Sequence, residues 1–182
     1  TDATTADVLA SLTVTGNAKV TLDVAGADAL RTINASANTG GVTVTAASTL
    51  AATITGGSGN DVLTAKTGTN ADTLVGGAGN DTLTSNAGLT TLTGGAGNDV
   101  FVVATAGANA NVYTTVTDFS AGDKLKFAAA GGAGTVDFVN AKVVLAATAS
   151  FTDYANAAAV AAGTDDIAWF QFGGDTYVVQ DL

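Results

Sequence analysis

A glycine-rich pattern of nine residues, Gly-Gly-x-Gly-Asn-Asp followed by an alternating apolar segment, constrains the fold of this chain more than any other feature. Its three good copies span residues 56–64, 76–84 and 94–102, and degenerate copies lie at 68–75 and 85–93. A fixed period of this kind indicates a repeat architecture, in which each repeat packs only against its neighbours. The repeats, rather than any single residue, therefore determine the type of fold.

The apolar residue at the centre of each repeat extends the period upstream. Thr- and Val-rich alternating segments surround these centres, and they favour short strands over helices. Two strands and two turns in each coil of about 18 to 20 residues predict a parallel β-solenoid (β-roll) of roughly five coils, with the centres as an inner ladder. The expected strand centres are Val14, Val24, Ile33, Val44, Ile54, Leu63, Leu74, Leu83, Leu92 and Phe101.

The C-terminal third is expected to be different, because the period is lost from Val112 onward. Short apolar segments bounded by glycine or polar turns predict antiparallel strands. The expected strands are 112–116, 124–127, 135–145, and a hairpin of 167–172 with 176–179 around Gly173-Gly174-Asp175. Ser150 or Thr152 is expected to cap a helix that runs to about Ala162 and stops at Gly163.

These segments predict an all-β fold with two parts. Residues 1–111 form the parallel β-solenoid, and 112–182 form a β-rich antiparallel segment with one short helix. We expect this second part to cap the solenoid, because bare edge strands invite further pairing.

Composition excludes several classes of function. All sixteen acidic residues are Asp, and His, Cys, Met and Pro are absent. A zinc ribbon, thiol or imidazole catalysis and an EF-hand are therefore excluded. The net charge of −10, with only six Lys and Arg, disfavours nucleic acid as a partner, and no apolar run is long enough for membrane insertion. No catalytic residues are found, so we expect no enzyme.

The repeated turn fits a calcium ion, which takes six to eight oxygen ligands at about 2.3 to 2.6 Å. Gly at the first, second and fourth positions permits the backbone angles that point several carbonyls inward, and Asp supplies charge. The good copies are separated by 20 and 18 residues, which places them on one edge of the solenoid. At least two Ca²⁺ ions are predicted there, one between Asp61 and Asp81 and one between Asp81 and Asp99.

The nonapeptide resembles the repeats-in-toxin (RTX) family of calcium-binding bacterial β-rolls. The resemblance covers residues 56–102 strongly, and 12–55 only through strand periodicity. It implies that main-chain carbonyls of two stacked turns complete each calcium shell. The implied ligands are Gly56, Ser58, Gly77 and Gly79 for one ion and Gly76, Ala78, Gly95 and Gly97 for the other, within turns that also contain Gly57, Gly59, Gly94 and Ala96.

Three further aspartates are weaker candidates. Asp118 and Asp123 lie in a segment that looks like the one closing such rolls, where either can complete a third site; the alternative is a solvated hairpin turn. Asp72 belongs to the opposite edge and stands alone, because Thr90 replaces Asp in the next turn. We expect weak binding or none on that edge.

Among proteins with such repeats, the chain most resembles bacterial surface-layer proteins exported by type I secretion, because Ala, Thr and Gly dominate its composition. This resemblance implies an extracellular structural protein in which Ca²⁺ drives folding and self-association into a lattice, with an anchoring partner that the sequence does not identify. Two alternatives stay open: the C-terminal folding and export module of an RTX exoenzyme such as a protease or lipase, and a piece of a large adhesin.

Overall fold

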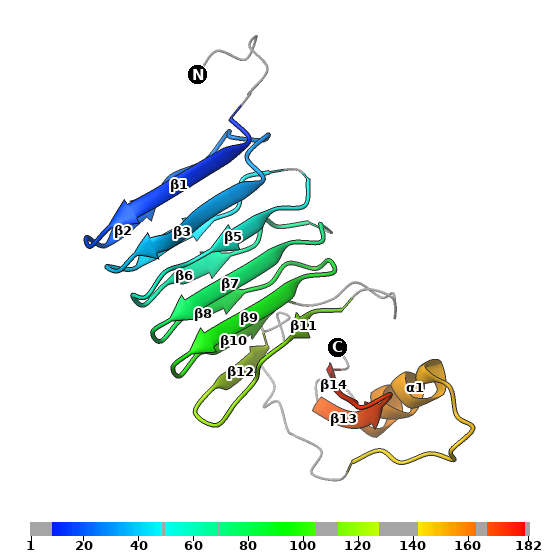
Figure 1. The fold of residues 1–182 in the computed structure, drawn as a ribbon. Coiled ribbons are helices and arrows are strands. Elements are labelled where there is room, and N and C mark those ends of the chain that lie inside the picture. The colour runs from blue at the N-terminus through cyan, green and yellow to red at the C-terminus, as the bar shows by residue number, and fades with distance from the viewer. Residues whose placement is uncertain are drawn as a thin grey trace, which may run out of the picture. The chain divides into compact units, whose positions relative to one another are not determined.

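The computed structural model describes residues 9–48, 50–68, 70–104, 113–127, 142–162 and 167–180, in two compact units, 1–128 and 129–182. The first unit is a parallel β-solenoid made of two six-stranded sheets (Figure 1). Sheet A contains β1 (Ser11–Gly16), β3 (Thr32–Asn38), β5 (Thr53–Thr55), β7 (Thr73–Ala78), β9 (Thr91–Ala96) and β11 (Thr115–Val116). Sheet B contains β2 (Val20–Leu22), β4 (Val42–Thr45), β6 (Val62–Thr64), β8 (Thr82–Thr84), β10 (Val100–Val103) and β12 (Lys124–Phe127).

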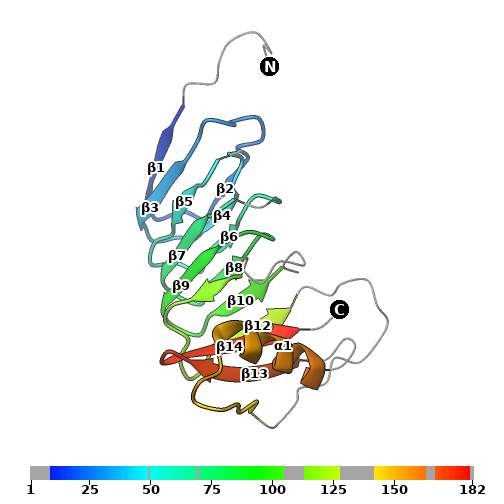
Figure 2. The same ribbon diagram turned by 90° about the vertical axis from the view of Figure 1, so that its right-hand side faces the viewer.

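The chain alternates between the two sheets, so that consecutive strands lie in opposite sheets (Figure 2). All pairings within both sheets are parallel. Short strands with glycine- or Asn-containing corners build this shape, since each strand is too short to stand alone and buries its apolar face only in a stack. The predicted parallel β-solenoid is confirmed.

The core is a pair of apolar ladders between the sheets. Every interior member from the second coil to the fifth is at most 3% exposed. The ladder of sheet A is Leu12, Ile33, Ile54, Leu74, Leu92 and Val116, and that of sheet B is Leu22, Val44, Leu63, Leu83, Phe101 and Leu125.

Two of the ten predicted strand centres are wrong. Leu12 rather than Val14 pairs with Ile33, and β1 has a register irregularity between Thr13 and Thr15. In the next strand, Leu22 pairs with Val44, whereas Val24 lies beyond the end of β2. Both valines still pack against the core. Alternation places residues two apart on the same face, so pattern alone does not select the one that lies in register.

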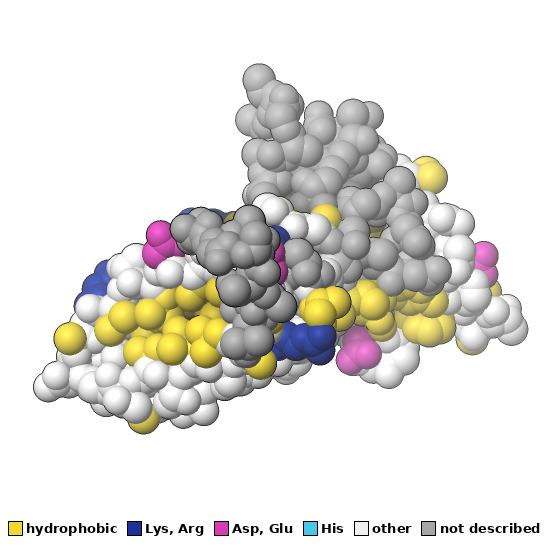
Figure 3. Space-filling view, turned by 90° about the horizontal axis from the view of Figure 1, so that it is seen from above, with side chains coloured by type: hydrophobic (Ala, Val, Ile, Leu, Met, Phe, Trp, Pro, Cys, Tyr) yellow, Lys and Arg dark blue, Asp and Glu magenta, His cyan; other side chains and the backbone are white. Residues whose placement is uncertain are grey.

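The β1 end of the solenoid leaves part of this core uncovered by described residues. Leu12, Val14, Leu22 and Val24 are only partly buried, in contrast to the ladder residues of the middle coils. Seen from above, hydrophobic side chains form a band across this end (Figure 3). A contiguous apolar band of this kind is a typical interaction surface.

The predicted antiparallel strands at 112–116 and 124–127 are wrong in direction. The strands found there, β11 and β12, pair in parallel with β9 and β10 and add a sixth coil. Their ladder residues, Val116 and Leu125, stand opposite Leu92 and Phe101. The glycine pattern is lost in this coil while the apolar positions persist. The unit that contains the solenoid runs through residue 128, whereas the sequence indicated a boundary after residue 111.

The second unit contains α1 (Phe151–Ala162) and an antiparallel hairpin of β13 (Ile167–Phe172) and β14 (Asp175–Gln180). The turn is Gly173-Gly174, both with positive φ (63° and 99°), which a two-residue hairpin loop requires. The predicted hairpin and helix are confirmed. Of the strand expected at 135–145, only 142–145 is described, and there Val143 makes an isolated parallel bridge to Phe170.

The helix begins with a reciprocal cap. The Asp153 amide donates to Ser150 Oγ (3.3 Å), and the Ser150 amide donates to Asp153 Oδ2 (2.8 Å). Ser150 is thus the cap, rather than Thr152, and the predicted stop at Gly163 lies outside the described residues. The aromatic rings of Phe151, Tyr154 and Phe170 pack where α1 meets the hairpin. No helix in the described segments is long and apolar enough to cross a membrane.

Candidate metal centre

The three glycine-rich copies and the turn before β12 form one edge of the solenoid, which we call the aspartate edge. Along it, each aspartate accepts the amide of the corresponding position one coil earlier. Asp61 Oδ1 accepts from the Val42 amide (2.6 Å), Asp81 Oδ1 from the Asp61 amide, Asp99 Oδ1 from the Asp81 amide and Asp123 Oδ1 from the Asp99 amide (2.8 Å each). One oxygen of every carboxylate thus ties two coils together.

The second carboxylate oxygens differ in their partners. Asp61 Oδ2 accepts the Gly57 amide (2.7 Å), and Asp123 Oδ2 accepts the Ser120 amide (2.7 Å). Asp81 Oδ2 is buried and has no hydrogen-bond partner. Asp61, Asp81 and Asp99 are each at most 2% exposed. A buried ionised carboxylate with an unpaired oxygen is costly, and a cation is the partner that removes this cost.

Glycine at the first repeat position is required by close approach. A Cβ on Gly56, Gly76 or Gly94 would collide with Oδ2 of the aspartate in the same repeat. On Gly56 it would also meet the Gly76 carbonyl oxygen, and on Gly76 that of Gly94. Carboxylate and main-chain oxygens therefore converge on the same small space at the Gly56 and Gly76 corners.

Glycine at the second and fourth positions is required by backbone conformation in two of the copies. Gly77, Gly79, Gly95 and Gly97 have φ between 101° and 139°, which L side chains rarely adopt. This confirms the conformational role that the sequence predicts for these glycines.

The electrostatics of the aspartate edge are those of a site that needs a cation. Burial, together with the neighbouring Asp61 and Asp99 carboxylates, raises the pKa of Asp81 to about 7. Burial also raises the pKa of Asp99, with Asp123 and Asp118 adding to the effect. The amide of Asp99 lowers the pKa of Asp123. A bound dication would keep all of these carboxylates ionised.

Main-chain oxygens have to supply most of the ligands. No group of three or more Asp, Glu, His or Cys side chains converges among the described residues. Calcium accepts mixed carboxylate and carbonyl shells, whereas zinc selects thiolate and imidazole. The oxygen-only corners therefore fit Ca²⁺.

Hydrogen bonds between coils place several of the predicted turn residues. The Ser58 amide donates to the Asn38 carbonyl (3.0 Å) and the Ala78 amide to the Gly57 carbonyl (2.8 Å). The Gly79 amide donates to the Ala96 carbonyl (2.8 Å). All these residues lie on the aspartate edge, as the spacing predicts. The carbonyls of Gly57 and Ala96 already accept a coil-to-coil bond.

The two C-terminal aspartates lie on the same edge in different roles. Asp118 accepts the amides of Gly94 (2.9 Å) and Gly95 (2.7 Å), so it closes the last glycine turn. Asp123 continues the aspartate ladder above Asp99. Asp72 lies on the opposite edge, where Oδ1 accepts the Ala52 amide (2.8 Å) and Oδ2 accepts Asn86 Nδ2 (3.0 Å).

An asparagine ladder beside the aspartates has a role that sequence analysis missed. Asn60 Oδ1 accepts the Asn80 amide, and Asn80 Oδ1 accepts the Asn98 amide (2.8 Å each). The nonapeptide pattern includes these asparagines but predicts no ladder between them. The signal was their recurrence at the same separations of 20 and 18 as the aspartates.

A parallel β-solenoid with glycine-rich, oxygen-lined corners along one edge defines the class of calcium-binding β-rolls. Residues 51–70 and 66–101 match the family model of the RTX calcium-binding nonapeptide repeat, in four copies. The chain therefore contains RTX calcium-binding repeats, which imply a Ca²⁺-binding structural role. RTX-repeat proteins are typically secreted, which fits an extracellular location. A comparison with curated proteins found no match.

Proposed function

We propose that Ca²⁺ bound along the aspartate edge drives folding of the solenoid, and that the folded chain is a structural element of a bacterial surface layer. The observation that carries the calcium-driven folding is Asp81, a carboxylate 1% exposed, with an unpaired Oδ2, between Asp61 and Asp99. Without a cation, these stacked carboxylates oppose the stacking of the coils that carry them.

The proposal assigns one ion between the Asp61 and Asp81 corners and one between the Asp81 and Asp99 corners. The surrounding main-chain carbonyls complete each shell. For a third ion, the candidates are Asp118 or Asp123 together with main-chain oxygens of the last turn, because each of these carboxylates raises the pKa of Asp99. Extracellular calcium modules bind at roughly 10⁻⁴ to 10⁻³ M, so the chain would fold after leaving a low-calcium cytosol.

Calorimetry and circular dichroism test the calcium-driven folding. Titration with CaCl₂ should show at least two ions bound per chain, and β-sheet ellipticity should rise over the same concentration range. Ellipticity that is already maximal in EDTA, with no heat of binding, would refute it. Mg²⁺ at the same concentrations is the control, since Mg²⁺ dehydrates reluctantly and demands octahedral geometry.

The surface-layer role is supported by composition and by the exposed apolar band at the β1 end. The absence of Glu, His, Cys and Met, and the dominance of Ala, Thr and Gly, suit a repetitive scaffold. We infer no catalytic activity, because the chain lacks the His and Cys on which many active sites depend. Self-association is the expected property, without nucleic acid as a partner and without membrane insertion.

Electron microscopy of the chain in calcium separates this role from the two alternatives. Ordered sheets or regular particles would support a lattice. A protein that stays monomeric at high concentration in calcium would contradict it, and would favour a folding and export module of an exoenzyme or a segment of an adhesin.

A further inference from the structure

The edge opposite the aspartate edge is held together by side-chain nitrogen atoms. We call it the lysine edge, and its corners in the described part of the chain lie at residues 23–31, 46–48 with 50–52, 65–68 with 70–72, and 85–90. These corners lack the Gly-Gly-x-Gly pattern. The first contains Asp23 and Asp28, whereas Asp72 is the single carboxylate in the described residues of the other three. From the second of these corners to the fourth, a main-chain oxygen at each step between coils accepts a hydrogen bond from a side-chain nitrogen of the next coil.

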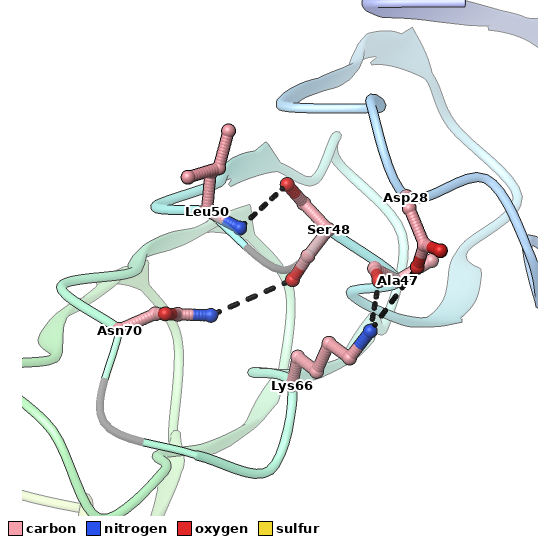
Figure 4. A network of polar contacts seen from close by, with 6 residues as sticks. All are labelled: Asp28, Ala47, Ser48, Leu50, Lys66 and Asn70. Carbon is pink, nitrogen blue, oxygen red and sulfur yellow. Dashed lines mark hydrogen bonds and ion pairs between the residues drawn. The ribbon is translucent and has the colours of Figure 1, made fainter. Parts of the chain in front are cut away.

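The first step is made by Lys66 and Asn70. Lys66 Nζ donates to the Ala47 carbonyl and lies 3.4 Å from Asp28 Oδ1 (Figure 4). Asn70 Nδ2 donates to the Ser48 carbonyl (3.5 Å), one coil earlier. Asp28 is well exposed, so its ion pair contributes little, and the bond from the ammonium to the Ala47 carbonyl is the main link.

The second step is made by Asn86. Its Nδ2 donates both to the Asn70 carbonyl (3.0 Å) and to Asp72 Oδ2 (3.0 Å), and Asn86 is 4% exposed. Since Asp72 Oδ1 accepts the Ala52 amide, both oxygens of this buried carboxylate have donors. Asp81 on the aspartate edge lacks such a donor for Oδ2.

We propose that Lys66, Asn70 and Asn86 take the place of calcium on the lysine edge, so that this edge joins its coils without metal. The ammonium of Lys66 supplies the positive charge and three donors. The two amides supply donors to carbonyl oxygens and to Asp72. The inference rests on the proposed function only in taking the aspartate edge as the calcium-dependent one.

The test compares Lys66→Met, which keeps the apolar stem and removes the donors, with Lys126→Met on β12 as a control for the lost charge. At saturating calcium, Lys66→Met should lower the melting temperature by about 2 to 4 °C. It should raise the calcium midpoint of folding by about twofold. Lys126→Met should change neither, and Lys66→Arg, which keeps donors and charge, should restore most of the loss.

Calorimetry of the same variants distinguishes side chains that replace a calcium ion from side chains that only block a calcium site. The number of ions bound should be the same in the unmodified chain and in Lys66→Met. An additional ion in Lys66→Met, or a melting temperature equal to that of Lys126→Met, would overturn the inference. A chain that binds no calcium would refute the proposed function, while the melting temperatures would still decide the role of Lys66.

Discussion

At the scale of single residues, the two buried aspartates Asp72 and Asp81 show how neighbours decide chemistry. Both are 1% exposed, and burial raises the pKa of both. Both carboxylate oxygens of Asp72 accept hydrogen bonds, one from the Ala52 amide and one from Asn86 Nδ2. Asp81 has carboxylates above and below it and an unpaired oxygen, so it depends on a cation.

Asp81→Asn should weaken calcium binding far more than Asp72→Asn, because Asp81 lies between the two proposed ions. We expect a loss of affinity on the order of 10- to 100-fold, the range typical of altered metal-site shells. Isothermal titration calorimetry measures both variants. Equal affinities for the two would contradict the assignment of the aspartate edge as the metal edge.

The pKa of Asp81 predicts the pH dependence of the calcium-free protein. The folded-state value of about 7 lies above the ordinary value of 3.8, so the protonated form favours folding. Its contribution is fully present below about pH 4 and is lost as the pH rises to about 7, a change on the order of 4 kcal/mol. In EDTA, β-sheet ellipticity should therefore be greater at pH 4.5 than at pH 8.

Two comparisons control this pH experiment. Asp81→Asn should reduce the pH dependence in EDTA, because its amide does not titrate. Saturating calcium should abolish most of it in the unmodified chain. Calcium-free β-sheet ellipticity that is the same at both pH values would show that Asp81 is not buried between the Asp61 and Asp99 carboxylates.

At the scale of elements, the strands are stabilised by one ladder residue each. Leu83 is the centre of β8, between Leu63 and Phe101, and is fully buried. The two flanking residues of β8, Thr82 and Thr84, face outward and are partly exposed to solvent. Short strands with a single central apolar residue have little redundancy, so each coil depends on its ladder position.

Leu83→Ala should lower the free energy of unfolding by about 2 to 5 kcal/mol, the range for large-to-small changes in a core. Leu89→Ala is the matched control, because Leu89 is 45% exposed and its change should stay within about 0.5 kcal/mol. Urea unfolding in saturating calcium measures both. Similar midpoints for the two variants would contradict the ladder as the core of the solenoid.

At the scale of the whole molecule, calcium should act on one unit and spare the other. The aspartate edge belongs to the first unit, whereas Trp169, the single tryptophan, lies on β13 in the second. The helix and hairpin of the second unit have a separate core that includes Phe151, Tyr154 and Phe170. The proposed metal ligands and Trp169 therefore belong to different units with separate cores.

Chelation by EDTA at pH 7.5 should abolish most of the β-sheet ellipticity, because the coils that carry Asp61, Asp81 and Asp99 lose their cations. The emission maximum of Trp169 should change little in the same sample. Fluorescence and circular dichroism recorded together measure both effects. Retained ellipticity, or a large red shift of Trp169, would contradict the division into a calcium-dependent and a calcium-independent unit.

The sequence by itself determined the solenoid and the aspartate edge. Glycine, asparagine and aspartate recur at separations of 20 and 18, and these separations state which corners stack. These signals are short and recur periodically along the chain, so they can be recognised without knowledge of the fold. The hairpin and the capped helix were predictable for the same reason, since their signals lie within a few residues.

Only the tertiary structure decided the features that depend on register between distant segments. The sixth coil formed by β11 and β12, and Leu12 rather than Val14 as a ladder residue, follow from pairing with strands about 20 residues or more away. The bond from Lys66 to the Ala47 carbonyl depends on the same stacking. A side chain that reaches a main-chain oxygen one coil away leaves no local pattern, because almost any residue supplies that carbonyl.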